Sequence, residues 1–280
     1  MDFLKPSEYE ELLKVGLRED APTGDITTMS LFDESATGEA ALVAKQDGVL
    51  AGIDVAAHVF SMLDPTFDFE ASYRDGARLK PGVVIAKLKG KTRALLTGER
   101  LALNLLQRMS GIATLAAAYV EAVAGLPVRI LDTRKTPPGL RVLDKYAVRA
   151  GGAYNHRMTL SDLAMVKDNH LQLAGGITAA VSQLKRACPG VRIEVETETL
   201  DHVREALNAG ADIIMLDNMP IELMRQAVKL IGGACTTEAS GNVRLDTVRS
   251  IAETGVDFIS VGELTHSVRA LDISLKSGYI

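Results

Sequence analysis

The chain has 280 residues, of which 47% are hydrophobic and 24% charged, so it can bury a large core in one or two domains. Its formal net charge of −5 argues against a non-specific nucleic-acid binder, and no apolar run approaches the roughly 18 residues of a membrane helix. Cys188 and Cys235 lack metal-type spacing, and the N-terminus lacks a signal-peptide pattern. We therefore expect a cytoplasmic protein that binds neither membranes nor nucleic acid.

The first part of the chain is predicted to form a small α+β domain. Ser7 and Glu10 have capping-box spacing and predict a helix start, and Pro22 and Gly24 predict a loop after that helix. Short apolar runs broken by DG, PG and KG turns predict an antiparallel sheet over residues 38–96. A long helix is predicted from about residue 97, and we place the domain boundary near residue 115, which gives domains 1–115 and 116–280.

The second domain alternates strand-like and helical patterns, which predicts parallel strands joined by helices. The predicted strands are 128–131, 164–166, 192–195, 212–216, 234–237 and 257–261. A helix is predicted over 199–209, ended by Gly210. Polar groups follow all six strands, whereas an open doubly wound sheet concentrates its site at one switch point. The fold class is therefore α/β, with a barrel-like domain preceded by the smaller one.

A cationic segment runs from Asp132 to His170. It contains seven Lys or Arg and four Asp, which leaves the rest of the chain at −8. Such a segment can be an ordinary solvated face, but Arg134 and Lys135 directly follow an apolar strand, and His156 and Arg157 directly follow GGAYN. Guanidinium and ammonium groups at those positions predict binding of a strongly anionic substrate.

Carboxylates and glycines end the later strands. Glu196 and Asp217 end consecutive strands and can hold Mg²⁺, form an acid/base pair or cap the following helices, and Asn218 adds an oxygen ligand. The pairs Ser240-Gly241 and Val261-Gly262 allow backbone N–H groups to approach a phosphate, although glycine also marks ordinary turns. Together these features predict a phosphorylated sugar as substrate. The remaining histidines are expected to be structural or exposed, namely His58, His202 and His266.

Long blocks of the sequence resemble quinolinate phosphoribosyltransferases. They are GDITT, QDGVLAG, GERLALNLLQRMSGIAT, DTRKTPPGLRVLDKYAVRAGGAYNHR, KDNH, EVE, LDN, EASGN and ISVGELTHS. The resemblance implies an N-terminal α/β sandwich and an incomplete α/β barrel of about seven strands, with the extreme C-terminus able to pack back on the sandwich. It also implies a homodimer, or a higher oligomer built from it, whose active sites are shared between subunits.

The resemblance also implies a role for each site residue. Arg134, His156 and Arg157 would hold the two quinolinate carboxylates, with Arg100 supplied by the other subunit. Lys135 and Lys167 would lie between quinolinate and the diphosphate of phosphoribosyl pyrophosphate. Glu196 and Asp217 would bind the ribose hydroxyls and Mg²⁺, the ion being held partly through substrate and water. The 5′-phosphate would bind at Ser240, Gly241 and Gly262.

The implied reaction is phosphoribosyl transfer to quinolinate with decarboxylation, which gives nicotinate mononucleotide, pyrophosphate and CO₂ in de novo NAD biosynthesis. Ala153 departs from the family's usual third glycine, and we expect its methyl group to narrow the loop slightly without abolishing activity. Two alternatives share the scaffold: a related protein of molybdenum-transport operons and a non-catalytic binding protein. The complete RKT, NHR and KDNH blocks argue against the first, and the carboxylates of the Mg²⁺ type argue against the second.

Overall fold

The computed structural model describes residues 4–278, and the chain divides into two compact units. One unit draws on Met1–Ala117, Thr136–Gly152 and Leu264–Ile280, and the other on Ala118–Lys135 and Ala153–Glu263. Each unit therefore combines segments that are distant in sequence. No helix among the described residues is long and apolar enough to cross a membrane.

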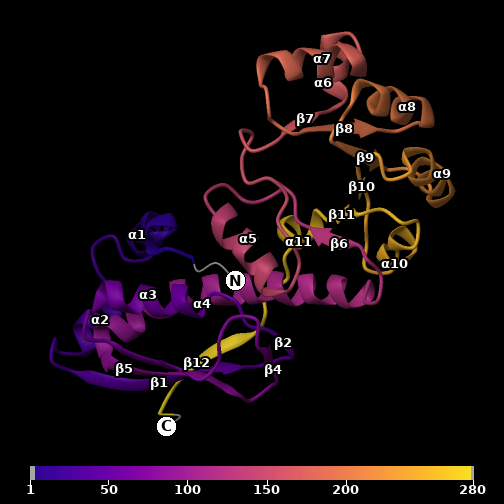
Figure 1. The fold of residues 1–280 in the computed structure, drawn as a ribbon. Helices are drawn as coiled ribbons and strands as arrows, with labels where there is room; N and C mark the ends of the chain where they lie inside the picture. The colour runs from indigo at the N-terminus through magenta and orange to yellow at the C-terminus, as the bar shows by residue number, and fades with distance from the viewer. Residues whose placement is uncertain (1–3, 279–280) are drawn as a thin grey trace. The chain divides into compact units, whose positions relative to one another are not determined.

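The first unit contains an antiparallel sheet in the order β12-β1-β5-β3, which confirms the sheet predicted for this region (Figure 1). A two-stranded sheet, β2 with β4, lies in the same unit. The strands are β1 (Thr37–Ala44), β2 (Gly48–Val49), β3 (Asp68–Ala71), β4 (Arg78–Leu79), β5 (Val84–Lys91) and β12 (Ile273–Ser277). The central strand β1 is buried from Ala40 to Ala44, because strands pair with it on both sides.

The helices of this unit differ in part from the sequence prediction. In place of one helix capped at Ser7, the structure has the 3-10 helix η1 (Pro6–Glu8) and the helix α1 (Glu10–Asp20). The Lys5 N–H donates to Glu8 Oε2 at 2.8 Å, so the predicted capping box of Ser7 and Glu10 was wrong. Three further helices are α2 (Ile26–Leu31), in the predicted loop; α3 (Ile53–Leu63), inside the predicted sheet region; and α5 (Arg141–Ala150). The long helix α4 (Thr92–Ala122) begins five residues early, because its first turn continues directly from β5.

The second unit is built on a parallel sheet in the order β6-β11-β10-β9-β8-β7. Its strands are β6 (Arg129–Leu131), β7 (Ala164–Val166), β8 (Ile193–Thr197), β9 (Ile213–Asp217), β10 (Thr236–Ser240) and β11 (Phe258–Ser260). Each of the six predicted strands is present, shifted by two residues or fewer at either end except at Ser240, three beyond the prediction. The α/β class is therefore confirmed.

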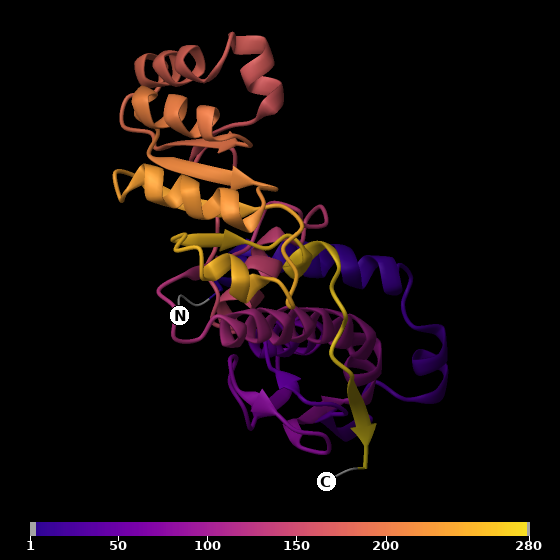
Figure 2. The same cartoon turned by 90° about the vertical axis from the view of Figure 1, so that its right-hand side faces the viewer.

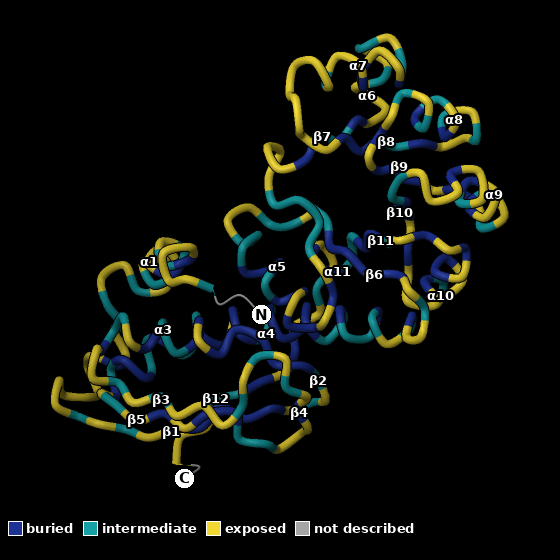
Figure 3. The backbone as a smooth tube through the Cα atoms, in the orientation of Figure 1, coloured by how far each residue is buried: buried dark blue, intermediate teal, exposed yellow. Residues whose placement is uncertain are grey.

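Helices join these strands and lie along the outside of the sheet (Figures 1 and 2). They are α6 (Asp168–Ala174), α7 (Ile177–Ala187), α8 (Leu200–Ala209), α9 (Ile221–Ile231) and α10 (Val248–Ala252). The short helix α11 (Glu263–His266) follows β11, and all of it but Glu263 belongs to the first unit. The predicted helix α8 begins where the Thr199 side chain accepts the His202 N–H and ends at Gly210, whose φ is 76°. The strands are mostly buried, whereas the outer faces of the helices are exposed (Figure 3).

The parallel sheet is an incomplete barrel with six strands among the described residues, rather than about seven. β6 and β7 form its two ends, and a single bridge joins Leu131 of β6 to Tyr154. Because all six strands are parallel, their carboxyl ends lie along one edge of the sheet. Side chains on the inner face at that edge are brought together from residues 129 to 260.

Candidate active site

A cavity of about 540 Å³ lies at the carboxyl ends of the parallel strands and belongs wholly to the second unit. Nine of the eleven residues given site roles from the family resemblance line it: Arg134, Lys135, His156, Arg157, Lys167, Glu196, Asp217, Ser240 and Gly241. Further lining residues are Thr133, Met165, Met215, Asn218, Glu238, Asn242 and Ser260. The sheet thus gathers cations, carboxylates and hydroxyls into one open pocket.

Two of the proposed site residues lie elsewhere. Gly262 lies two residues after the end of β11 and is not among the residues that line the cavity. Arg100 is an exposed residue of α4 in the other compact unit. The cationic segment is also divided, because Arg141, Lys145 and Arg149 lie on α5 in that other unit.

Strand alternation explains which side chains face the cavity. Successive side chains of a strand point to opposite faces, so residues two apart share a face. Glu194 and Glu196 therefore lie on one face of β8, and Glu238 and Ser240 on one face of β10. The inner member of each pair is fully buried, whereas the outer member lies at the strand end and is partly exposed.

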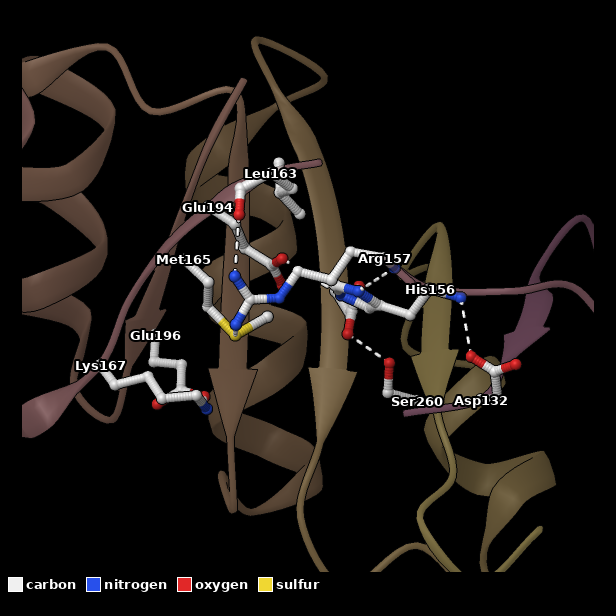
Figure 4. Close-up of polar contacts among 10 residues, drawn as sticks. Asp132, His156, Arg157, Leu163, Met165, Lys167, Glu194, Glu196 and Ser260 are labelled. Carbon is white, nitrogen blue, oxygen red and sulfur yellow. Dashed lines mark hydrogen bonds and ion pairs between the residues drawn. The ribbon is translucent and has the colours of Figure 1, made fainter. Parts of the chain in front are cut away.

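The segment that carries His156 and Arg157 is fixed by a buried carboxylate. Asp132, which follows β6 and is fully buried, accepts the His156 backbone N–H at 2.9 Å (Figure 4). It also accepts the Asn155 side-chain N–H at 2.5 Å. Backbone hydrogen bonds from the Tyr154 N–H to the Ile130 carbonyl and from the Asp132 N–H to the Tyr154 carbonyl hold the same segment. A rigid main chain is what an accurately placed charged side chain requires.

Arg157 extends across the inner face of the sheet. Its Nη1 donates to the Leu163 carbonyl at 2.8 Å, and its Nη2 lies 3.5 Å from the Met165 sulfur (Figure 4). Burial and repulsion from Arg134 lower the pKa of Arg157. The buried Arg134 Nε has no hydrogen-bond partner among the described residues. Two guanidiniums that repel one another favour a ligand with more than one negative charge.

His156 lies between two buried glutamates. Its Nε2 is 3.2 Å from Glu194 Oε2 and 3.5 Å from Glu238 Oε2, and its Nδ1 accepts the Arg157 backbone N–H at 2.7 Å. Burial lowers the pKa of His156, but hydrogen bonding and attraction to both carboxylates outweigh it and raise that pKa to about 9. Nδ1 can accept the Arg157 N–H only while it is unprotonated, so the ring proton in this arrangement is on Nε2, between the two carboxylates.

Glu196, Asp217 and Lys167 form the opposite side of the cavity. Lys167 makes an ion pair with Glu196 Oε1, and Asp217 Oδ2 accepts from the Asn218 side chain at 2.9 Å. Burial raises the pKa of Glu196; Lys167 opposes this shift, and the charge of Asp217 adds to it. Two neighbouring carboxylates that repel one another, with oxygens at an accessible edge, fit a divalent cation that prefers oxygen ligands and retains water.

The turns after β9 and β10 are held together by asparagines. The Asn242 side chain donates to Asn218 Oδ1 at 2.9 Å, and the Asn218 N–H donates to the Ser240 carbonyl at 2.9 Å. Gly241 has a φ of 90°, and a Cβ there would lie 2.2 Å from Asn218 Oδ1. Glycine is therefore required at this position, and its open backbone allows close approach of a ligand.

Three participants were missed from sequence. Glu194 lies inside the predicted strand 192–195, Glu238 directly follows the predicted strand 234–237, and Asn242 follows the pair Ser240-Gly241, which alone was considered in EASGN. The signal for Glu194 was present in IEVE: once Glu196 is assigned to the cavity, the residue two positions earlier must share its face. The same argument leads from Ser240 to Glu238.

The fold and the cavity define an α/β enzyme whose site suits a strongly anionic substrate. Residues 25–110 match the family described as "Quinolinate phosphoribosyl transferase, N-terminal domain", and residues 112–276 match its "C-terminal domain". The chain belongs to the quinolinate phosphoribosyl transferase family. It is accordingly a transferase of the phosphoribosyl class.

Named relatives agree over nearly the whole chain. A probable nicotinate-nucleotide pyrophosphorylase (carboxylating) of Bacillus subtilis is 47% identical, over 96% of this chain and 93% of its own length. The chloroplastic carboxylating enzyme of Arabidopsis thaliana is 45% identical, over 96% of this chain and 82% of its own. The crystal structure of NadC from Streptococcus pyogenes has a TM-score of 0.95 at 44% identity, over 99% of this chain and 98% of its own.

Proposed function

We propose that this chain transfers the phosphoribosyl group of phosphoribosyl pyrophosphate to quinolinate, with loss of CO₂, in the de novo route to NAD. The observation that carries the proposal is one cavity with two guanidiniums on one side and a carboxylate pair on the other. Such a cavity suits a dicarboxylate beside a ribose whose departing group is heavily charged. The relatives named for this reaction, at 43–48% identity, support it.

The cationic residues receive the acceptor. Arg134 and Arg157 bind the two carboxylates of quinolinate, because planar guanidiniums pair with carboxylates through two parallel hydrogen bonds. His156 lies beside them, with Nδ1 accepting the Arg157 N–H. Lys135 and Lys167 lie between the acceptor and the diphosphate and attract both. Arg134 and Arg157, called the clamp below, hold quinolinate with its pyridine nitrogen toward the ribose. The nitrogen is then already oriented for attack on the ribose carbon, which lowers the entropic cost of the reaction.

The carboxylates receive the donor. Glu196 and Asp217 bind the ribose hydroxyls and hold Mg²⁺, and the 5′-phosphate binds at Ser240 and the open backbone of Gly241, with Gly262 nearby in sequence. Mg²⁺, when bound, neutralises charge on the leaving diphosphate. The two carboxylates stabilise positive charge that develops at the ribose carbon.

The reaction requires no covalent intermediate on the protein. The bond from the ribose carbon to the diphosphate oxygen breaks with its electron pair on oxygen, and the pyridine nitrogen forms a new bond to that carbon. The nitrogen becomes positive. The bond to the 2-carboxylate then breaks and releases CO₂, its electron pair stays on the ring carbon beside the positive nitrogen, and a proton from solvent or the site replaces CO₂.

The reaction is tested with purified protein, quinolinate carrying a ¹³C-labelled 2-carboxylate, phosphoribosyl pyrophosphate and Mg²⁺. We expect nicotinate mononucleotide, pyrophosphate and labelled CO₂ in equal amounts, with Lys167→Ala as the impaired variant. Absence of nicotinate mononucleotide under conditions in which a known family enzyme is active would contradict the proposal.

We also propose a homodimer, or a higher oligomer built from it, in which the partner subunit's Arg100 completes each site. Arg100 is exposed and belongs to a compact unit other than that of the cavity, which fits a residue supplied in trans. Mixing Arg100→Ala with Lys167→Ala subunits should restore part of the activity, because some sites then have both groups. No recovery in verified heterodimers would contradict shared sites. Both cysteines are free thiols, which supports a cytoplasmic location.

A further inference from the structure

Glu194 and Glu238 form a buried acidic pair beneath the cation side of the cavity. Both residues are completely buried, on β8 and β10. Glu238 Oε1 accepts a hydrogen bond from Ser260. The other three carboxylate oxygens accept no hydrogen bond among the described residues, and two of them, Glu194 Oε2 and Glu238 Oε2, lie near Nε2 of His156.

Two carboxylates cannot remain buried so close together without positive charge or a shared proton. The Nε2 to oxygen separations of 3.2 and 3.5 Å are compatible with a proton on Nε2 that both carboxylates attract. A metal ion is the other candidate, since one ligand atom from each residue lies within 4.8 Å of the others. A proton is favoured over a metal ion because positive charge is already present beside the two carboxylates. The guanidinium of Arg157, attracted by Glu194 and repelled by Arg134, supplies it.

His156 transmits this anchoring to the substrate clamp. Nε2 faces the acidic pair, Nδ1 accepts the Arg157 N–H at 2.7 Å, and the His156 N–H is bound by Asp132 at 2.9 Å. The imidazole is therefore held at both ring nitrogens and the His156 main chain at its N–H, and one of the ring contacts is the backbone of Arg157. Rotation of the ring would disturb the residue that carries the guanidinium.

We propose that Glu194 and Glu238 are positioning residues, which hold a proton on Nε2 of His156 between them and thereby fix Arg157 for the binding of a dicarboxylate. The inference rests on the proposed function only for the identity of that dicarboxylate, quinolinate. Neither glutamate is a catalytic residue in this account. They act through His156.

The first test separates quinolinate binding from turnover in Glu194→Gln and Glu238→Gln, which keep side-chain size and remove charge. We expect the KM and Kd for quinolinate to rise about tenfold or more, as for other residues that orient a ligand-binding group, with kcat and the KM for phosphoribosyl pyrophosphate changed less than about threefold. The matched control is Glu222→Gln, an exposed residue of α9, which should leave all constants unchanged. An unchanged quinolinate Kd in a folded variant overturns the proposal.

The second test needs no variant and no turnover. ¹⁵N NMR of the histidines in the full chain should show Nε2 of His156 protonated at pH 7, assigned by comparison with His156→Gln. An unprotonated Nε2, or a stoichiometric metal ion at this position that chelators remove, overturns the proposal. Quinolinate binding by calorimetry is measured independently of product formation, so failure of the proposed reaction and failure of the positioning role give different results.

Discussion

The two sides of the cavity are built differently. On the clamp side, Asp132, Glu194 and Glu238 are fully buried and bind other protein groups. On the strand-end side, Lys167 is exposed and Glu196 and Asp217 are partly exposed, with oxygens facing the open cavity. Buried polar networks fix geometry, whereas exposed groups are free to exchange water for ligand. We infer that the clamp is formed before substrate arrives and that the strand-end side is completed by substrate and Mg²⁺.

The largest expected effect is on the strand-end side. Asp217→Asn keeps the size of the side chain but removes a negative charge that stabilises positive charge at the ribose carbon. We expect kcat to fall about 10²–10³-fold, as when one preorganised electrostatic group is removed from an active site. Quinolinate affinity should change little. Steady-state kinetics and calorimetry on the same preparation check this, and a large loss of quinolinate affinity would show that the two sides are not separate.

On the clamp side we expect a smaller effect, on quinolinate binding rather than on kcat. Arg134→Ala removes a charge-assisted contact and should weaken quinolinate binding by about 2 kcal/mol, or about 30-fold. The affinity for phosphoribosyl pyrophosphate should stay within about threefold. Arg244→Ala, an exposed residue paired with Asp246, is the control. Equal losses for both substrates would place Arg134 outside the dicarboxylate clamp.

Gly241→Ala tests the turn that joins the strand ends. A methyl group there meets Asn218 Oδ1 at 2.2 Å in a backbone with φ of 90°, so we expect a loss of about 1–2 kcal/mol in the free energy of unfolding. The KM for phosphoribosyl pyrophosphate should rise more than that for quinolinate. Gly125→Ala has a similar φ of 85° and open space, and it separates backbone strain from the clash. Equal behaviour of the two variants would contradict the role given to Asn218.

The smallest expected effect is the dependence of stability on pH. Because the pKa of His156 is raised to about 9 in the folded protein, the folded state binds more protons than the unfolded state above about pH 6.5. This stabilisation is complete below about pH 6.5 and is lost as the pH rises through about 9. Between pH 7 and 8 we expect the free energy of unfolding to fall by about 1 kcal/mol. Urea unfolding of the wild type and of Glu238→Gln checks the sign. The same slope in both proteins would contradict the raised pKa.

The sequence predicted the groups at strand ends better than those inside strands. Glu196 and Asp217 were predicted because each directly follows an apolar run, where parallel strands place their ends at one edge. Glu194 was missed because a charged residue within a strand usually lies on the solvent-exposed face. In this barrel-like sheet the face that carries Glu194 is the inner one, and that arrangement cannot be read from the strand alone. Arg100 could be assigned from the family resemblance alone, since no local pattern distinguishes it from other exposed helix residues.

Long-range pairing limited the prediction of the fold. The strand β12 was not predicted from local pattern, because its partner β1 lies more than 200 residues earlier, with Ala40 opposite Ser277; only the family resemblance indicated that the C-terminus can pack on the first domain. α3 was missed because its apolar residues lie between strand-like runs of similar composition. The cationic segment was treated as one site because it is continuous in sequence, yet α5 carries its middle part in the other unit. Continuity in sequence therefore overstated the extent of the site.

The most direct measurement compares quinolinate with nicotinate as acceptor under identical conditions with phosphoribosyl pyrophosphate and Mg²⁺. A clamp with two guanidiniums requires two carboxylates, so we predict rapid conversion of quinolinate with release of one CO₂ per nicotinate mononucleotide and little or no conversion of nicotinate. Equal conversion of nicotinate, without CO₂ release, would contradict the account.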